Sequence, residues 1–456
     1  MILKITVIGG GGVRAMFLAK SLAQKSEALG IDEIVFMDNN EQKLNIYGKM
    51  AKKVALSINP DISFSLTLDA KEAVTDADYV ITTIREGGDE MRVEDEKIAL
   101  KYNVIAQETT GACGLSFAMR SVYVLIEYCE LIKKYAKPNC KVFNFTNPAG
   151  VVSQTLLDAG YDFTYGICDT PSSMLRTFAK LYGADENAVK GELYGLNHLS
   201  YFSSVTLNGK EIIDELLDND EAYTKTDMRY FDKQLLKERH AIFNEYLYYF
   251  YYREKALRNI INAEKTRGMQ ILDINKAMTE ELSKIDIDND FETALKIFEH
   301  YYGMRENNYM ASETGIKRDT EWKFDINEKD DGGYAGVALN YIEIMQSGKS
   351  DSMVLCTANN GAIKGLLNDD IVEITCDITK DGVFPHKNIK TDEQNLELVI
   401  HVKIYERLAS KAIREKSIES AVEALTMHPL VNSYSLAKAL VNDFLELNRE
   451  YTADWS

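Results

Sequence analysis

Short apolar runs alternate with amphipathic stretches in the first part of the chain. Residues 4–9 (KITVIG) are apolar enough for a buried parallel strand, and a glycine turn and a helical pattern follow over residues 10–29. Because strands and helices alternate over about 165 residues, the pattern predicts a Rossmann-like, doubly wound parallel sheet. Its later strands are expected in residues 33–40, 62–69, 77–84, 140–150 and 163–170.

The pattern changes after residue 210, where apolar residues recur at helical spacing over long stretches. A chain of 456 residues is too long for one ordinary core. We therefore predict an α/β protein with two domains, a Rossmann-like domain over residues 1–167 and a mainly helical α+β domain over residues 168–456. In the second part, helices are expected in residues 232–257, 285–305, 395–427 and 433–450, and strands in 352–358 and 370–378.

The net charge of −19 argues against a surface that binds nucleic acid or anionic membrane, because such surfaces need clustered Lys and Arg. A small anionic substrate remains compatible with this charge if a local basic pocket receives it. The hydrophobic content of 45% is ordinary for a globular protein. The composition therefore favours a small-molecule ligand over a nucleic acid or a membrane.

The cysteine pattern does not predict a disulfide framework. No CxxC pair occurs and the chain is long, and disulfide-rich scaffolds are usually short secreted chains. No signal peptide and no run of ~18 apolar residues is recognisable, so a cytoplasmic location is expected. The six cysteines are Cys113, Cys129, Cys140, Cys168, Cys356 and Cys376.

The first strand leads into the glycine-rich turn ITVIGGGGVRA, residues 5–15. Two registers fit a dinucleotide motif, Gly9-x-Gly11 or Gly10-x-Gly12-x-x-Ala15, and Val13 completes the turn. Glycines let the backbone approach a pyrophosphate at a helix N-terminus, and Asp38 at the end of the next strand would accept hydrogen bonds from a ribose. We predict an NAD site with a preference for NAD over NADP; the alternative is a glycine turn without a ligand.

A cysteine and a histidine follow two apolar segments thirty residues apart, Cys168 in YGICDTPSS and His198 in YGLNHLSYF. A thiolate and a neutral imidazole suit a borderline transition metal. Both segments are expected to end at the carboxyl edge of the sheet, where such folds bind ligands. The alternative is a buried cysteine and a structural histidine.

Two further stretches contain candidate chemistry. The glycine-bounded loop NVIAQETTGACG, residues 103–114, contains Glu108, which is a candidate functional carboxylate. The alternative is a plain surface loop without a functional role. The stretch IREGGDEMR contains Arg85 and Arg92. Arginine forks match phosphate oxygens, so an anion pocket is one interpretation, and pairing with nearby acids is the other.

Seven motifs occur here in the order seen in glycoside hydrolase family 4: TVIGGGG, IREGGDEMR, QETTGACG, NFTNPAG, GICDTP, GLNHLS and NNGAI, residues 359–363. The chain resembles this family, and most closely its 6-phosphoglucosidases, from residue 4 to the helical C-terminus with HPLV at 428–431. The resemblance implies an architecture like that of lactate and malate dehydrogenases. It also implies a homodimer or homotetramer that acts on a sugar phosphate.

The resemblance further implies that NAD and a divalent metal, usually manganese, are required. In the implied reaction NAD takes a hydride from carbon 3 of the sugar, which acidifies the proton on carbon 2. A base removes that proton, the leaving group departs from carbon 1, water adds, and the hydride returns. This elimination route differs from the paired-carboxylate mechanism of most glycosidases.

The family's functional residues match positions of this chain one by one. The resemblance assigns Cys168 and His198 as metal ligands and Asp169 as the acid that assists the leaving group. Glu108 matches an essential carboxylate, and Tyr246 in NEYLYYF matches the base at carbon 2.

The implied substrate contacts are Arg92, Asn147, Asn197 and Arg267. This chain departs from the family at Gly12-Val13-Arg14, because a Ser or Thr usually follows the glycines there and helps to hold the 6-phosphate. Whether the 6-phosphate is required, and which anomer is cleaved, therefore stay open at this stage.

Three alternative functions remain. Relatives that act on unphosphorylated sugars or uronates place His after the metal cysteine, where this chain has Asp169. A 2-hydroxyacid dehydrogenase would share the cofactor fold but use an Arg-Asp-His set without a metal. An inactive NAD sensor is disfavoured by the intact set of Cys168, His198 and Tyr246.

Overall fold

The computed structural model describes residues 2–329, 335–452 and 454–456. The chain forms two compact units whose segments are interleaved along the sequence. This division differs from the sequential boundary expected at residue 167, which stays a prediction. Unit 1 comprises Met1–Glu108, Met119–Thr146 and Glu254–Leu339, and unit 2 comprises Thr109–Ala118, Asn147–Arg253 and Asn340–Ser456.

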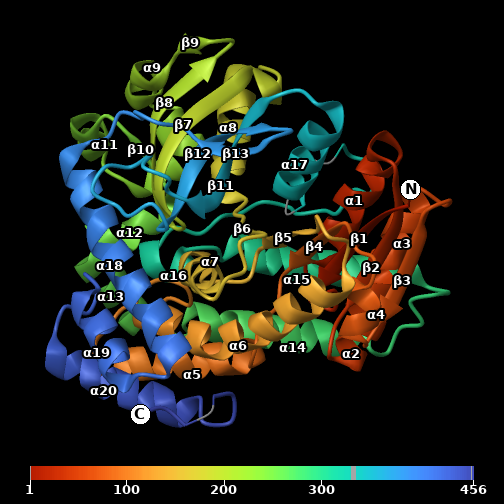
Figure 1. The fold of residues 1–456 in the computed structure, drawn as a ribbon, viewed down its shortest axis with the longest axis horizontal. Helices are drawn as coiled ribbons and strands as arrows, with labels where there is room; N and C mark the ends of the chain where they lie inside the picture. The colour runs from red at the N-terminus through yellow and green to blue at the C-terminus, as the bar shows by residue number, and fades with distance from the viewer. Residues whose placement is uncertain (1, 330–334, 453) are drawn as a thin grey trace. The chain divides into compact units, whose positions relative to one another are not determined.

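Unit 1 is built on a parallel sheet with the strand order β5-β4-β1-β2-β3, shown in red to yellow in Figure 1. The central strand β1 is almost completely buried, as expected for a parallel strand covered on both faces. The predicted Rossmann-like sheet is therefore confirmed. Its strands are β1 (Leu3–Ile8), β2 (Ile31–Met37), β3 (Ser63–Thr67), β4 (Tyr79–Thr82) and β5 (Lys141–Asn144).

The helices of unit 1 pack on this sheet and on one another. Helix α1 packs against α3 and ends at Gly30, whose left-handed conformation (φ 62°) suits a residue without Cβ. The helices are α1 (Ala15–Leu29), α2 (Glu41–Lys43), a π-helical turn (Leu44–Gly48), α3 (Lys49–Ile58), α4 (Ala70–Val74), α5 (Gly88–Lys101), α13 (Arg253–Asn262), α14 (Arg267–Leu282), α15 (Phe291–Asn307) and α16 (Ala311–Thr314). Helices α6 (Ala112–Tyr135) and α17 (Gly336–Ser347) each have residues in both units, and the first residue of α13, Arg253, belongs to unit 2.

Unit 2 contains antiparallel strands in two groups. In the first, β11 (Asp351–Ala358) pairs with β6 (Thr164–Gly166) and β12 (Ile371–Thr379), and β12 pairs with β13 (Gly382–Pro385). The strands expected in residues 352–358 and 370–378 are thus confirmed. The second group is the hairpin of β7 (Val189–Leu196) and β8 (Leu199–Leu207), with β9 (Lys210–Glu211) and β10 (Ile242–Phe243) on β8.

Helices make up most of the rest of unit 2. The helical stretch expected over 395–427 is two helices, because Lys416 adopts a left-handed conformation (φ 54°) and Ser417 caps the next helix. No helix in the described part of the chain has the length and apolar character needed to cross a bilayer. The helices are α7 (Ala149–Asp158), α8 (Thr170–Tyr182), α9 (Ile213–Asp218), α10 (Ala222–Lys225), α11 (Lys233–Arg239), α12 (Tyr248–Tyr251), α18 (Glu393–Glu415), α19 (Ile418–Met427) and α20 (Tyr434–Leu447), with 3₁₀ turns at Glu186–Ala188, Asp227–Tyr230 and Glu245–Leu247.

The single long helix predicted over residues 232–257 is wrong. Helix α11 ends at His240, which adopts a left-handed conformation (φ 46°). The next residues, Ile242 and Phe243, pair with β8 instead of continuing the helix. The amide of Asn244 then donates to the carbonyl of Ser200, so pairing with a strand outweighs the local helical pattern.

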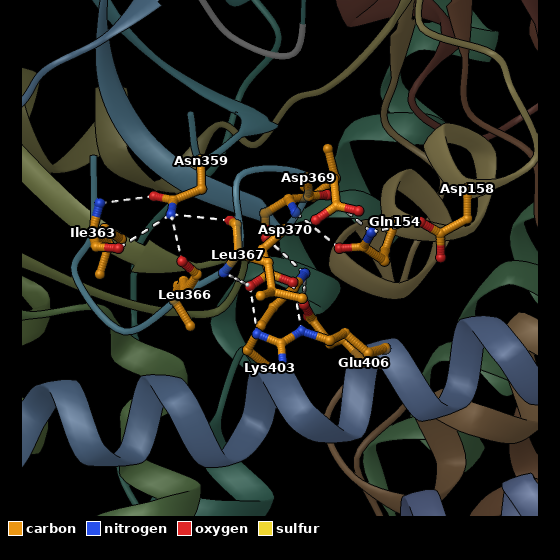
Figure 2. A network of polar contacts seen from close by, with 12 residues as sticks. Gln154, Asp158, Asn359, Ile363, Leu366, Leu367, Asp369, Asp370, Lys403 and Glu406 are labelled. Atoms are coloured by element: carbon orange, nitrogen blue, oxygen red, sulfur yellow. Dashed lines mark hydrogen bonds and ion pairs between the residues drawn. The ribbon is translucent and has the colours of Figure 1, made fainter. Parts of the chain in front are cut away.

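A buried polar network joins α18 to β12 and to the loop between β11 and β12 (Figure 2). The ammonium of Lys403 donates to the carbonyl of Ile371 at 2.7 Å and to the carboxylate of Glu406 at 2.8 Å. The amide of Asn359 donates to three loop carbonyls and accepts from the backbone N–H of Ile363. The NNGAI motif therefore has a structural role in shaping this loop.

Candidate functional site

The glycine turn of unit 1 lies between β1 and α1. The backbone amides of Gly9 and Gly10 both donate to the carbonyl of Met37 at 2.8 Å. Gly9 has φ 99°, and a Cβ there would lie 2.5 Å from the carbonyl oxygen of Thr83. Only glycine fits this close approach, so the turn stays narrow just before the start of α1, where dinucleotide folds bind a pyrophosphate.

Asp38 follows β2 and its carboxylate closes on the glycine turn. One oxygen accepts the backbone N–H of Gly11 at 2.9 Å, and the other accepts the N–H of Asn40 at 2.9 Å. A Cβ on Gly11 would lie 2.9 Å from this carboxylate, so the glycine is needed here as well. Gly12 and Val13 complete the turn before α1. Asp38, which is expected to bind a ribose, and the glycine turn, which is expected to bind a pyrophosphate, therefore contact each other.

Glu108 lies in a cluster of charged side chains in unit 1. Its Oε2 atom lies 2.6 Å from Arg85 Nη1 and 3.0 Å from Arg92 Nη1. Burial alone would raise the pKa of Glu108, but Arg85 and Arg92 outweigh it and hold the pKa well below the ordinary value. Arg92 also pairs with Glu96 at 2.9 Å. Glu108 is therefore an ionised carboxylate whose position is fixed.

Two arginines near this cluster have buried nitrogens for which the described part of the chain offers no hydrogen-bond partner. Arg267 donates from Nη2 to the carbonyl of Arg305 at 3.0 Å, whereas Arg267 Nη1 and Arg305 Nε have no partner within the described residues. Burial and the charges of Arg92 and Arg305 lower the pKa of Arg267. An anion would satisfy these donors and offset the repulsion. Arg305 is a site residue that the sequence analysis missed.

Cys168 and Asp169 follow the end of β6 and precede α8 in unit 2. Asp169 is the N-cap residue of α8, and Pro171 lies in its first turn. Burial, followed by the charges of Glu373 and Asp169, raises the pKa of the Cys168 thiol well above its ordinary value. A bound cation would reverse this effect and favour the thiolate.

His198 does not follow a strand of the parallel sheet, so that expectation is wrong. It lies in the two-residue turn between the antiparallel strands β7 and β8, where Leu196 pairs with Leu199. Its ring stacks on the ring of Tyr246, with centroids 3.9 Å apart and planes 3° apart. The hairpin turn, not a sheet edge, presents the candidate ligand.

Tyr246 lies in the segment where the expected helix is interrupted. The side chain of Asn244 accepts the backbone N–H of Tyr246 at 3.0 Å and starts a short 3₁₀ turn. The neighbouring Glu245 accepts a hydrogen bond from the hydroxyl of Thr170 at 3.2 Å. The segments that contain Cys168, His198 and Tyr246 therefore meet in unit 2, and their roles in one site stay a prediction.

Glu373 is a second site residue that the sequence analysis missed. It lies in β12 with 1% of its surface exposed and accepts from Asn197 Nδ2 at 3.0 Å and from Ser200 Oγ at 2.7 Å. Burial raises the pKa of Glu373 to about 7, and the two hydrogen bonds offset only part of the effect. The signal in the sequence was an acidic residue inside the apolar run DIVEITCDI.

The donor set in unit 2 fits a metal with open coordination positions. Across the described residues, no cluster of three or more His, Cys, Asp or Glu side chains is able to hold a metal ion. Cys168 and His198 would supply a sulfur and a nitrogen ligand, and substrate oxygens and water would complete the sphere. Such a site is suited to bringing a substrate to the metal.

Two predicted substrate contacts in unit 2 also have internal hydrogen bonds. Asn197 uses its amide for Glu373. Asn147 precedes the cis-Pro148 bond, and its side-chain oxygen accepts from the N–H of Ala149 at 3.4 Å. Their contact with a substrate stays a prediction.

Two family models match most of the chain. The model described as family 4 glycosyl hydrolase matches residues 4–184, and that of the family 4 glycosyl hydrolase C-terminal domain matches residues 193–431. A 6-phospho-beta-glucosidase of Thermotoga maritima is 30% identical over 98% of this chain and 99% of that protein.

Solved structures agree with these matches. The Thermotoga maritima 6-phospho-beta glucosidase, solved with manganese, NAD+ and glucose-6-phosphate, has a TM-score of 0.81 and 29% identity over 99% of both chains. A 6-phospho-alpha-glucosidase from gut microorganisms, in complex with NAD and glucose-6-phosphate, has a TM-score of 0.81 and 25% identity over 100% of both chains. A metagenomic lactate dehydrogenase shares the fold, with a TM-score of 0.51, 12% identity, and coverage of 91% of this chain and 99% of that one.

Proposed function

The chain belongs to glycosyl hydrolase family 4, and from that premise we propose that it hydrolyses the O-glycosidic bond of 6-phospho-glucosides with NAD and a divalent metal such as manganese. The observation that most supports this function is the stacking of Tyr246 on His198 at 3.9 Å. It brings a candidate base next to a candidate metal ligand. The relatives solved with NAD, manganese and glucose-6-phosphate support the same choice of ligands.

The proposed division of work follows the two units. The glycine turn and Asp38 would bind NAD in unit 1, and Cys168 and His198 would hold the metal in unit 2. When bound, NAD accepts and returns a hydride, and the metal polarises the carbon 3 carbonyl as a Lewis acid. No net oxidation of the sugar results.

Two side chains of unit 2 are proposed to move protons. Tyr246 takes the proton from carbon 2, and Asp169 gives a proton to the leaving oxygen on carbon 1. A phenol has an ordinary pKa of ~10, so this role requires positive charge next to Tyr246. Its contact with His198 meets that requirement if His198 is a metal ligand.

The arginines of unit 1 are proposed to recognise the 6-phosphate. Among the described residues, Arg267 Nη1 and Arg305 Nε are buried donors without partners, which an anion would satisfy. Arg14 is the N-cap residue of α1, in the stretch where the family usually has a hydroxyl, and its charge acts on Glu108. We therefore propose that Arg14 replaces the missing hydroxyl with charge and that Arg92 and Glu108 maintain the shape of the pocket.

The test is a screen of chromogenic α- and β-glucosides, with and without a 6-phosphate, in the presence of NAD and Mn²⁺. Turnover is expected only with 6-phosphorylated substrates. Removal of the metal by EDTA should abolish it, and Mn²⁺ should restore it. Full turnover by Cys168→Ser, or equal turnover of phosphorylated and unphosphorylated substrates, would contradict the proposal.

A further inference from the structure

His198 occupies a backbone conformation that costs free energy. It is the second residue of a two-residue hairpin turn and has φ 63°. Left-handed backbone is uncommon for residues other than glycine, although histidine tolerates it better than most. A glycine would form this turn more easily, so the side chain of His198 has to be held there by other contacts.

Thr109 contacts the ring of His198 directly. Its hydroxyl lies 2.9 Å from His198 Nδ1, and both side chains are buried, with 9% and 8% of their surfaces exposed. A hydrogen bond at Nδ1 fixes the rotation of an imidazole ring, so that a metal would be bound through Nε2. The carbonyl of nearby Gly111 accepts a hydrogen bond from Tyr405 at 3.4 Å, which fixes the Thr109 loop.

Glu373 accepts hydrogen bonds from two side chains that flank His198 in the same hairpin. Its two oxygens accept from Asn197, the residue before His198, and from Ser200, two residues after it. Glu373 is on β12, a different strand group, so the two hydrogen bonds tie the tip of the hairpin to a second sheet. The charge of Glu373 also acts on Cys168. One buried carboxyl group is therefore next to both segments that would bind the metal.

We propose that Glu373 and Thr109 are positioning residues that hold the Asn197-His198 turn in the geometry needed for metal binding. Glu373 holds the side chains of Asn197 and Ser200 on either side of His198, and Thr109 holds the imidazole ring. This inference rests on the proposed function, because it takes Cys168 and His198 as the ligands of a divalent metal. Neither residue is assigned a role in the chemical steps.

The test measures Mn²⁺ affinity without turnover, from the free Mn²⁺ signal in electron paramagnetic resonance, with NAD present and no substrate. Loss of an outer-shell partner typically costs 10–100-fold in metal affinity. We expect that loss in Glu373→Leu and Thr109→Val, which remove the hydrogen bonds. In Glu373→Gln and Thr109→Ser, which keep them, the affinity should stay within about threefold of the parent.

Glu406→Gln is the matched control. Glu406 is another buried carboxyl group of unit 2, 5% exposed, but its partner is Lys403 (Figure 2). This variant should unfold at a lower temperature with unchanged Mn²⁺ affinity. At saturating Mn²⁺, Thr109→Val should recover turnover to within about tenfold of the parent, because a positioning residue acts through metal occupancy.

The outcomes separate this inference from the proposed function. Parent-like Mn²⁺ affinity in Glu373→Leu and Thr109→Val would overturn the inference and leave the metal site standing. Mn²⁺ binding that survives in full in Cys168→Ser would instead overturn the metal site itself. If Glu373→Leu does not fold, the test rests on the two variants of Thr109. Equal Mn²⁺ affinities of Thr109→Val and Thr109→Ser would then overturn the inference.

Discussion

Glu108 of the unit 1 cluster and Glu373 of the unit 2 cluster are both glutamates with little exposed surface, but their surroundings differ. Glu108 contacts two arginines, and they hold its pKa well below the ordinary value. Glu373 contacts an amide and a hydroxyl, and its pKa rises to about 7. Burial acts in the same direction on both residues, so the charge of the partner decides which form is stable.

The difference separates two kinds of site. The site of unit 1 is rich in fixed charge, which suits the binding of an anionic substrate and of a cofactor phosphate. In unit 2 the charges that act on Cys168 are the acidic ones of Glu373 and Asp169, and burial also disfavours the thiolate. These surroundings suit proton transfer and metal binding, because an added cation would act strongly on buried acidic groups. Variants in unit 1 and variants in unit 2 should therefore change different measured properties, such as NAD affinity in one case and turnover in the other.

The largest effect is expected for Tyr246→Phe, which removes the proposed base of unit 2. Turnover should fall by about 10²–10⁴-fold, the usual contribution of general-base catalysis, while NAD affinity stays unchanged. In deuterated water the parent enzyme should place deuterium on carbon 2 of the product. Tyr249→Phe is the control, since Tyr249 is a neighbouring buried tyrosine whose ring centroid lies 6.2 Å from that of Tyr246 and which is assigned no role in the reaction. Product without deuterium would rule out the elimination route.

The next effect is the pH dependence of stability due to Glu373. Its pKa is raised from 4.5 to about 7 in the folded protein, so the folded state binds the proton more tightly than the unfolded state. The contribution of Glu373 to the free energy of unfolding of the metal-free protein should therefore be fully present below pH 4.5 and be lost as the pH rises through 7. This contribution is of the order of 3 kcal/mol. Urea unfolding at several pH values should show it as a pH-dependent difference between the parent and Glu373→Gln.

Glu108→Gln should show the opposite behaviour in unit 1. The substitution removes a counter-charge from Arg92, whose side chain is 8% exposed, and should lower the free energy of unfolding by about 2 kcal/mol near neutral pH. Because the pKa of Glu108 is depressed, the difference from the parent should shrink as the pH falls below the ordinary glutamate value. A difference that grows in acid would contradict the ion-paired description of this site.

The smallest effect is expected for Asp38→Ala. Loss of the ribose acceptor should weaken NAD binding about 5–10-fold, which corresponds to about 1 kcal/mol. Fluorescence titration measures this affinity, and Mn²⁺ affinity should stay unchanged because the metal ligands are in unit 2. The exposed Asp61→Ala provides a control for the loss of one negative charge. Unchanged NAD affinity would count against the cofactor site.

The parts of the site that depend on local sequence were predictable. A strand, a turn of glycines, a helix and Asp38 follow one another within about thirty residues, and local backbone rules are enough to predict the turn. The strands and most helices follow from periodicity in the same way. Cys168 and His198 were identified as a pair from residue chemistry and from the family resemblance.

The parts that depend on contacts between distant segments were not predictable. The periodicity of residues 232–257 favours a helix, but pairing of Ile242 and Phe243 with β8 interrupts it and places Tyr246 beside His198. The hydrogen bond of Thr109 to His198 joins residues 89 positions apart. Glu373 lies 173 residues from Ser200, and no local pattern indicates that pairing.

The interleaved units impose an order on the synthesis of the chain. The strands of the parallel sheet are complete once residue 144 has been made, but helices α14 and α15 of the same unit follow only after residues 147–253. At the usual ~5–20 residues per second, this intervening segment takes about 5–20 s to translate. During that time the sheet of unit 1 lacks helices α14 and α15. Chaperone binding should therefore be strongest on nascent chains whose synthesis is stalled within residues 147–253.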